Sequence, residues 1–389
     1  MRGKSTVDLV NVFRRIESYL QIKNRNIYSM SASEQAEYIM AFPEPKDEID
    51  RSFYQYQCQK ALGDSKTGAF LKIAAFVPYW ALRIKYVISA GPTMIKQAKA
   101  VFLPDGKADD VIPNVLREEF SGWEIEDNKN YYLNKEDIRF IKQVAKKYHK
   151  DGMFLLKITT KVARYRYIID TFRPKALIVC NEYSFTSSVM KLFCEKNNIE
   201  LINVMHGEKL YVMSDAFFSF NRCYVWDKYY IELFTKLRAE KSQFRIEIPN
   251  SMRLIGYENS KKTVDYTYYL TDENKQQVQQ IIDIMSKIAK NGNVVAIRSH
   301  PRYTDVNKIK TKLPAGILIE APRDISIQES LARTKNAISF ASTVLNQAHA
   351  NGINIILDDM IRPEEFKKLK EQCYIMINVD HKLLSEIRK

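Results

Sequence analysis

From about residue 99 onward, short apolar runs alternate with longer amphipathic segments. The runs ALIVC at 176–180 and ELINV at 200–204 are continuous and apolar, which predicts buried strands. The segment 184–196 between them has apolar residues at helical spacing and predicts an amphipathic helix. Buried strands separated by helices are typical of a parallel sheet with helices on both faces. The pattern therefore predicts the α/β class.

The alternation restarts in the second half of the chain. A strand is expected at 253–255, residues 257–269 are polar and predicted to be irregular, and a helix is expected over 272–291. Further strands are expected at 294–298, 317–320, 337–340 and 353–357.

Two such series predict two Rossmann-like domains, 1–250 and 251–389. We expect them to face a central cleft, because ligands of open α/β sheets bind outside the carboxyl ends of the strands. The boundary is expected near 245–260, and a last helix over 382–389 is expected to cross back to the first domain.

Residues 1–99 predict a mainly helical N-terminal extension, with one helix over 7–20. The stretch 68–90 is apolar and aromatic but is interrupted by basic residues and Pro78, so it is too charged to span a bilayer. A buried helix pair kinked at Pro78 is the favoured interpretation. The alternative is a contact with the plane of a membrane surface.

The composition adds a strong positive charge. Sixty Lys and Arg residues against 46 Asp and Glu give a formal net charge of +14. Such a field attracts nucleic acid, anionic lipid or phosphorylated ligands. A basic nucleic-acid-binding scaffold is therefore an alternative, although nucleic acid is the less favoured partner because no signature of the common binding modules is present.

The five cysteines are widely spaced and form no CxxC pair, which argues against a disulfide framework or a zinc site. No apolar region of a secretory signal follows the basic start, and no uncharged run reaches about 18 residues. These features predict a cytoplasmic protein, with attachment to the inner face of the membrane as an option.

The first candidate motif, Met205-His206-Gly207-Glu208, directly follows the expected strand at 200–204. A glycine after the histidine permits a tight turn that exposes the imidazole. An imidazole with a pKa near 6.5 is suited to remove a proton from an alcohol. His206 or Glu208 is therefore a candidate general base; a locally satisfied histidine beside a turn is the commoner use of such a pair.

The second motif, Arg298-Ser299-His300-Pro301-Arg302, directly follows the expected strand at 294–298. Arginine and histidine at a strand end can bind phosphate or neutralise charge on a nucleotide leaving group. A basic surface turn is the plainer alternative.

The third motif joins the strand at 337–340 to a helix. Ser342 is expected to cap that helix, and Ser339 and Thr343 add hydroxyls. A helix N-terminus with free N–H groups can bind phosphate, although an ordinary cap is the simpler interpretation. Between the second and third motifs, Glu320 is a candidate partner for a nucleobase or ribose.

These motifs, in this order, resemble bacterial surface-polysaccharide transferases of the GT-B fold. The segments HPR, EAPRDISIQESL and SFASTVLNQAHANGI between residues 300 and 353 are similar to bacterial sialyltransferases, in which a His-Pro and a Ser-Ser/Thr motif bind the CMP of CMP-sialic acid. The MHGE and SHPR motifs are also similar to the CDP-glycerol glycerophosphotransferases of teichoic-acid synthesis. The resemblance covers residues 175–360.

The resemblance implies a glycosyltransferase that moves a CMP-activated, sialic-acid-like sugar to a glycan or lipid-linked acceptor in capsule or surface-polysaccharide synthesis. The alternative that it implies is transfer of a polyol phosphate from CDP-glycerol or CDP-ribitol. Sialyltransferases carry an acidic motif in the first half, where this chain has His206-Gly207-Glu208. Asp105, in Pro104-Asp105-Gly106, is the substitute base.

It also implies a nucleotide site made by the second and third motifs. Its expected residues are Arg298, His300, Pro301, Arg302, Glu320, Ser339, Ser342 and Thr343. His300 is further expected to assist departure of the nucleotide. Because a P-loop, GxGxxG and a short Asp-x-Asp are all missing from the sequence, neither a bound cofactor nor an obligate metal is expected.

Overall fold

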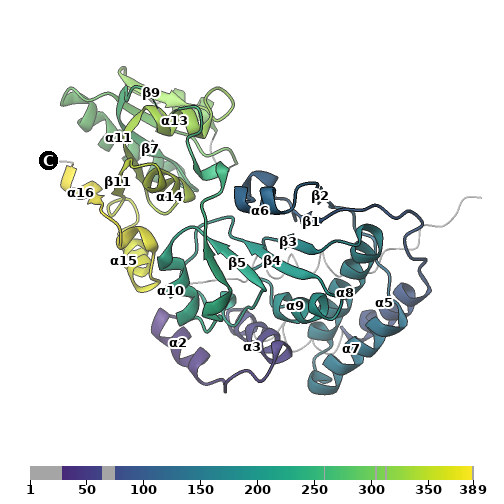
Figure 1. The fold of residues 1–389 in the computed structure, drawn as a ribbon. Helices are drawn as coiled ribbons and strands as arrows, with labels where there is room; N and C mark the ends of the chain where they lie inside the picture. The colour runs from purple at the N-terminus through teal and green to yellow at the C-terminus, as the bar shows by residue number, and fades with distance from the viewer. Residues whose placement is uncertain (1–28, 64–74, 258, 303–304, 312, 388–389) are drawn as a thin grey trace, which may run out of the picture. The chain divides into compact units, whose positions relative to one another are not determined.

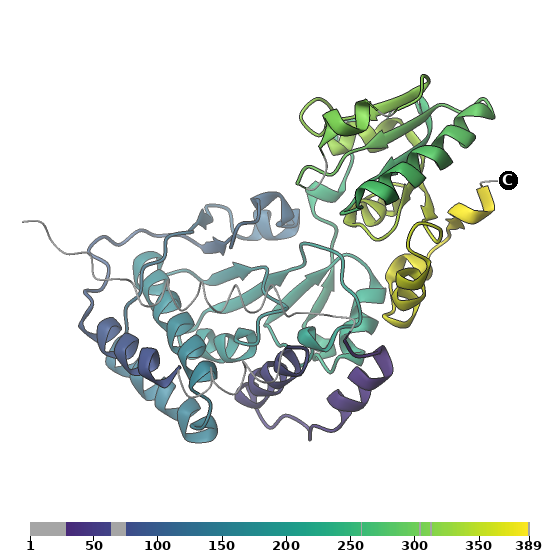
Figure 2. The ribbon, with the colours of Figure 1, turned by 180° about the vertical axis from the view of Figure 1, so that it is seen from behind.

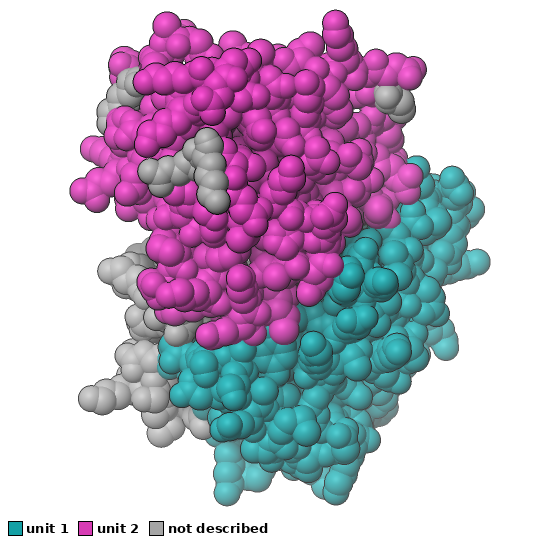
Figure 3. Space-filling view, turned by 90° about the vertical axis from the view of Figure 1, so that its left-hand side faces the viewer, with its two compact units in different colours: residues 1–206, 211–247 teal, residues 207–210, 248–389 magenta. Residues whose placement is uncertain are grey.

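The computed structural model describes residues 29–63, 75–257, 259–302, 305–311 and 313–387 (Figure 1). The chain divides into two units, coloured separately in Figure 3. The first comprises residues 1–206 and 211–247, and the second comprises residues 207–210 and 248–389. The division falls inside the interval 245–260 expected from the sequence, but it also assigns the short segment 207–210 to the second unit.

The first unit is built on a six-stranded, wholly parallel sheet in the order β2-β1-β3-β4-β5-β6 (Figure 1). The strands are β1 (Ala100–Leu103), β2 (Glu124–Ile125), β3 (Ala176–Val179), β4 (Glu200–Val204), β5 (Arg222–Val225) and β6 (Phe244–Ile246). Every residue of β1 and β3 is buried, because helices cover both faces of the sheet.

Eight described helices surround this sheet. They are α2 (Ala32–Met40), α3 (Glu48–Ala61), α5 (Phe76–Ile88), α6 (Asn114–Glu119), α7 (Lys135–Tyr148), α8 (Gly152–Phe172), α9 (Ser187–Glu195) and α10 (Lys228–Lys236). Helix α8 is buried along most of its length because its apolar residues recur on every side, and α5 and α7 pack against it (Figure 2). The helix expected over 7–20 lies outside the described residues, as do residues 68–74 of the apolar stretch.

The second unit contains another six-stranded parallel sheet, in the order β12-β11-β10-β7-β8-β9. The strands are β7 (Val264–Tyr269), β8 (Val295–Arg298), β9 (Ile317–Glu320), β10 (Thr334–Ser339), β11 (Asn354–Leu357) and β12 (Lys382–Leu383). Read from the β9 edge, the strands follow one another as third, second, first, fourth, fifth and sixth, which is the strand order of dinucleotide-binding Rossmann domains. The predicted α/β class with two Rossmann-like units is confirmed.

The helices of the second unit are α11 (Lys275–Lys290), α12 (Val306–Lys310), α13 (Ile327–Arg333), α14 (Thr343–Ala350), α15 (Pro363–Glu371) and α16 (Leu384–Ile387). Ile281 and Met285 of α11 pack into a core with Val295 and Ile297 of β8, and all four side chains are fully buried. The amphipathic pattern of residues 272–291 therefore serves to cover one face of the sheet.

Three expectations for this unit were wrong. Residues 264–269 form the central strand β7 although they were predicted to be irregular, because tyrosine and threonine suit a strand without making an apolar run. Residues 253–255 form no strand; a short 3₁₀ helix, Asn250–Met252, precedes them. The expected last helix over 382–389 begins with β12, which pairs with β11, so this segment stays with the second unit.

Candidate functional site

A histidine and a glutamate meet at the carboxyl edge of the first sheet. His206 comes two residues after β4, and Glu182 comes three residues after the neighbouring strand β3. The imidazole Nδ1 lies 3.5 Å from Glu182 Oε1. Glu182 is completely buried, and its Oε2 accepts a hydrogen bond of 3.1 Å from Asn203 Nδ2. A buried carboxylate in this position orients the imidazole and stabilises its protonated form.

The side chain of His206 keeps 13% of its surface exposed, and the ring of Tyr183 stands edge-on to it with 6.3 Å between centroids. Nε2 is the ring nitrogen on the side away from Glu182. The arrangement can therefore take a proton from a hydroxyl at Nε2. Glu182 was missed in the sequence, where the only available signal is an acidic residue shortly after the strand next to the one that leads to His206.

Asp105 lies at the carboxyl end of β1, in a turn where its own φ is 44° and that of Gly106 is 85°. Its carboxylate pairs with Arg164 at 2.9 Å and with Lys161 at 3.8 Å. Burial acts to raise the pKa of Asp105, but Lys161 and Arg164 outweigh it and hold the pKa below its usual value. Asp105 is therefore a weaker base than an ordinary carboxylate, and it is better suited to accept hydrogen bonds from a bound ligand.

The strand order places these side chains together. The carboxyl ends of β1, β3 and β4 are neighbours, and the chain reverses its direction of strand addition between β1 and β3. In open α/β sheets such a reversal is where ligands bind. Asp105, Glu182 and His206 thus surround the expected ligand position of the first unit.

Glu208 does not join this group. It belongs to the second unit, where its carboxylate accepts a short hydrogen bond from Asn346 Nδ2 and its backbone N–H donates to Thr343 Oγ1 over 3.4 Å. Glu208 is therefore held at the first turns of α14 by these two contacts. The role of general base that was expected for it does not fit this position.

The second sheet brings the other two motifs to one edge. His300 follows β8, and Ser342 follows β10, with only β7 between these two parallel strands. Because neighbouring strands are about 4.8 Å apart, the two strand ends are separated by about 10 Å. The reversal of strand order lies between β7 and β10, so both motifs flank the ligand position expected for a Rossmann domain.

His300 is half-buried, and its Nδ1 accepts a hydrogen bond of 3.1 Å from the backbone N–H of Arg302. A neutral imidazole with an accepting Nδ1 carries its proton on Nε2, so it can donate to a phosphate oxygen without being charged. Burial and the nearby Arg302 both lower the pKa of His300, although Asp272 opposes them. Pro301 and Arg302 are exposed beside it, as expected for a turn.

A cavity of about 480 Å³ opens beside His300. One wall is Ser299, His300 and Pro301 after β8, and the opposite wall is Ala321, Pro322 and Arg323 after β9. The start of α12 closes a third side with Asp305, Val306 and Asn307. The volume lies in the range that small-molecule sites occupy.

Ser342 caps α14 as predicted: its Oγ accepts from the backbone N–H of Val344 at 3.3 Å. Ser339 is fully buried and donates to the carbonyl oxygen of Tyr269 at 2.8 Å, so it ties β10 to β7. The ligand contact expected of Ser339 is therefore wrong in this structure. Ser342 and Thr343 remain the hydroxyls at the strand-to-helix turn.

Arg298 and Glu320 also turn inward, against expectation. Arg298 is buried, lies 3.4 Å from Glu320 and donates to the carbonyl oxygen of Ile325 at 2.9 Å. The other oxygen of Glu320 accepts from Arg333 at 2.6 Å, and no surface of Glu320 is exposed. This buried ion pair links the ends of β8 and β9, and neither side chain is accessible to a ligand.

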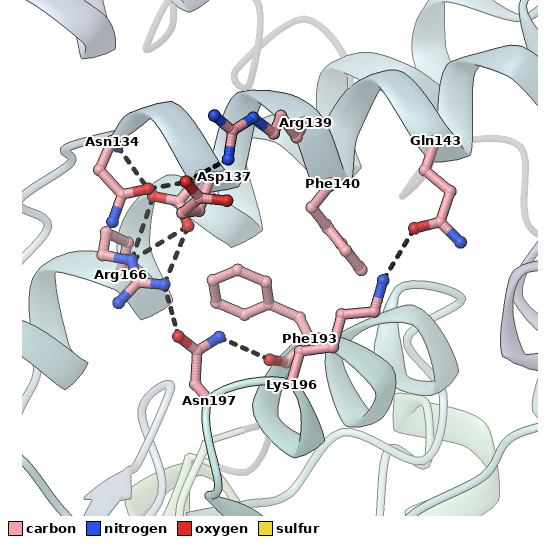
Figure 4. Close-up of a pocket in the computed structure, with 10 residues that line it drawn as sticks. Asn134, Asp137, Arg139, Phe140, Gln143, Arg166, Phe193, Lys196 and Asn197 are labelled. Carbon is pink, nitrogen blue, oxygen red and sulfur yellow. Dashed lines mark hydrogen bonds and ion pairs between the residues drawn. The ribbon is translucent and has the colours of Figure 1, made fainter.

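A second cavity, of about 590 Å³, lies among α7, α8 and α9 of the first unit (Figure 4). Figure 4 shows the rings of Phe140 and Phe193 between two polar groups of residues. Arg166 pairs with Asp137 and Asn197 on one side, and Lys196 donates to Gln143 on the other. The contacts of Arg166 and Lys196 therefore link residues of all three helices across this cavity.

Among the described residues, no group of three or more His, Cys, Asp or Glu side chains is placed to hold a metal ion. The two strand-end groups are made of imidazole, carboxylate, hydroxyl and backbone N–H groups.

The sequence matches no known family model and no curated protein. The wall teichoic acid polymerase TagF, as its H548A variant, is similar in structure with a TM-score of 0.44 and 10% identity over 82% of this chain and 88% of that one. The glycotransferase of kitacinnamycin has a TM-score of 0.45 and 7% identity over 76% of this chain and 89% of that one. The UDP-GlcNAc 2-epimerase from Methanocaldococcus jannaschii has a TM-score of 0.39 and 14% identity over 73% of this chain and 93% of that one.

Proposed function

We propose that this protein is a glycosyltransferase of bacterial surface-polysaccharide synthesis that uses a nucleotide-activated donor. The observation that carries the proposal is the placement of His300 and the Ser342-Thr343 turn on either side of β7, at the carboxyl edge of a sheet with Rossmann strand order. The second unit binds the donor, and the first unit binds the acceptor.

The donor is a CMP-activated, sialic-acid-like sugar, as the His-Pro and Ser-x-x-Ser-Thr resemblance implies. The nucleoside occupies the cavity between Pro301 and Pro322. Its phosphate accepts from His300 Nε2 and lies toward the turn at Ser342 and Thr343. Glu208 already lies at that turn, so its contact with Asn346 loosens when the phosphate binds.

In the reaction, the acceptor hydroxyl gives its proton to His206, and Glu182 stabilises the imidazolium that forms. The acceptor oxygen bonds to the anomeric carbon as the bond from that carbon to the phosphate oxygen breaks. CMP leaves with the electron pair of the broken bond, and the hydrogen bond from His300 stabilises the developing negative charge. Asp105, which stays ionised, accepts hydrogen bonds from acceptor hydroxyls.

A polyol-phosphate transferase that uses CDP-glycerol or CDP-ribitol would employ the same residues. The acceptor oxygen would then attack phosphorus, and the product would contain a phosphodiester in place of a ketoside. Both reactions use the same His206-Gly207 motif after β4, so the position of the residues does not separate them. Analysis of the product does.

Calorimetry with CMP, CDP, UDP and GDP tests the donor site directly. We expect CMP or CDP to bind best, and His300→Ala to weaken that binding while circular dichroism stays unchanged. His381→Ala is the matched control, because His381 lies in another loop and contacts the carbonyl oxygen of Val379. A His300→Ala variant that keeps wild-type affinity and transfer would overturn the assignment.

We place the protein at the inner face of the cell membrane, where a lipid-linked acceptor would be found. The proposal requires no resident cofactor or metal. Transfer should therefore persist after treatment with EDTA, and its loss, with recovery on adding a divalent cation, would contradict this part of the proposal.

A further inference from the structure

Helix α5 carries a stripe of large apolar side chains that stays exposed among the described residues of its unit. Val77, Trp80, Ile84, Val87 and Ile88 are 75%, 54%, 61%, 47% and 78% exposed, respectively. The opposite side of the same helix is buried through Pro78, Tyr79, Leu82 and Tyr86, which face the body of the unit. A soluble helix ordinarily has one apolar face; α5 has two.

The spacing of the exposed residues makes the stripe continuous. Positions 77, 80, 84, 87 and 88 differ by three, four, three and one, so at 3.6 residues per turn they fall on one side of the helix. Arg83 and Lys85 lie on opposite flanks of this stripe by the same geometry. The Arg83 guanidinium stacks over the Trp80 ring at 5.0 Å, which keeps it beside the stripe.

The charged residues of α5 and of the segment that follows it have one sign. Residues 75–104 include four Lys or Arg residues and no Asp or Glu. Apolar side chains between basic flanks are typical of helices that lie in the interface of an anionic membrane, because the basic groups reach lipid phosphates while the apolar side chains enter the acyl boundary.

Helix α5 is too short to span a bilayer, so it would lie along the membrane surface. Its 13 residues extend about 20 Å, whereas a spanning helix needs about 20 residues. No helix among the described residues is both long and apolar enough to cross a bilayer.

We infer that the exposed stripe of α5 is a docking surface for an anionic lipid bilayer. A second copy of the chain fits it less well, because each copy would bring the same basic flanks and no acidic partner along this helix. The inference concerns binding alone, so it holds or fails independently of the proposed transfer reaction.

Flotation of the full chain with vesicles tests the surface. We expect binding to phosphatidylcholine vesicles containing 30% phosphatidylglycerol and little binding to pure phosphatidylcholine. The double variant Trp80→Glu/Ile84→Glu should lose binding. Ile246→Glu is the matched control, since Ile246 is 52% exposed on β6 and should leave binding unchanged.

Replacing both flanking cations, Arg83→Gln/Lys85→Gln, should weaken binding by about 25-fold, because each basic residue near an anionic surface contributes about 1 kcal/mol, or about fivefold. The emission of Trp80 supplies a second readout, because an exposed indole that enters the interface shifts to shorter wavelength. The Trp80→Phe variant should float but lose most of that shift, because Trp226 is buried and Trp123 packs against the core of the first sheet.

Two results would overturn the inference. One is equal flotation of the wild type and Trp80→Glu/Ile84→Glu. The other is a wild-type dimer in sedimentation that this variant converts to monomer, with no vesicle binding, because the stripe would then be an interface between copies. Transfer to a soluble acceptor should be equal in the wild type and this variant, which separates failure of docking from failure of the proposed function.

Discussion

The Oε1 atom of Glu182 and the Nδ1 atom of His206 lie 3.5 Å apart, and the carboxylate is wholly buried. Two adjacent parallel strands bring the pair together from positions 24 residues apart in the chain. Because the carboxylate is buried, it can reach a ligand only through a neighbouring side chain, and we assign it as a positioning residue for His206.

We expect Glu182→Gln to lower kcat by at least about tenfold, which is a part of the 10²–10⁴-fold that a general base contributes. An amide keeps the size of the side chain but no longer stabilises the imidazolium. KM for the donor should change little, and the pH at which kcat falls on the acidic side should move. Transfer assays across pH measure both effects.

The matched control for that variant is Glu118→Gln, an exposed glutamate on α6. Unchanged kcat and pH profile in Glu182→Gln would show that His206 works without its carboxylate, and would remove Glu182 from the mechanism.

The stability of the second unit should depend on pH through His300. Burial and Arg302 hold the pKa of His300 below its ordinary value of about 6.5, so the unfolded chain binds this proton more readily than the folded one. Stability should therefore fall as the pH drops from 7 through 6.5 toward the folded pKa. Urea titrations at several pH values should show that the free energy of unfolding falls less in His300→Gln than in the wild type. A fall of the same size in that variant would assign the effect to other groups.

Removing one partner of the Arg166–Asp137 pair should destabilise the first unit. Both side chains are at least nine-tenths buried and lie 3.0 Å apart, so Arg166→Met leaves a buried carboxylate without its counter-charge. Breaking such a pair costs about 3–5 kcal/mol. Urea denaturation should show this loss, and Arg166→Met/Asp137→Leu should recover part of it.

Arg139→Met is the comparison for that prediction. Like Arg166, Arg139 lines the cavity among α7, α8 and α9. It pairs with Glu136, but both side chains are about 70% exposed. An exposed pair contributes about 0–1 kcal/mol. Equal losses in Arg139→Met and Arg166→Met would contradict the burial argument.

The cysteines should differ sharply in reactivity. Cys58, Cys180, Cys194 and Cys223 are buried, and Cys373 alone of the five is partly exposed. Burial raises the pKa of Cys58 to about 12, so little thiolate is present at pH 8. Ellman's reagent should label one thiol rapidly in the folded protein and five in urea. A Cys373→Ser variant that still labels rapidly would contradict the burial of the other four.

Local patterns along the chain were enough to predict the class of the fold and the chemistry at several strand ends. Continuous apolar runs such as 176–180, flanked by amphipathic helical segments, predict buried strands of a parallel sheet, and the residues that follow such strands are expected at its carboxyl edge. That reasoning located His206, His300 and the capping role of Ser342.

The three-dimensional fold was needed to show which strand ends are neighbours and which side chains turn inward. Strand order depends on long-range pairing, so local patterns could reveal neither the Glu182–His206 pair nor the position of β7 between His300 and Ser342. Arg298 and Glu320 look like ligand groups in the sequence, but pairing with each other lets both be buried. The sequence left open whether the apolar stretch around α5 is buried or exposed, because an apolar residue has the same letter whether a neighbouring element covers it or not.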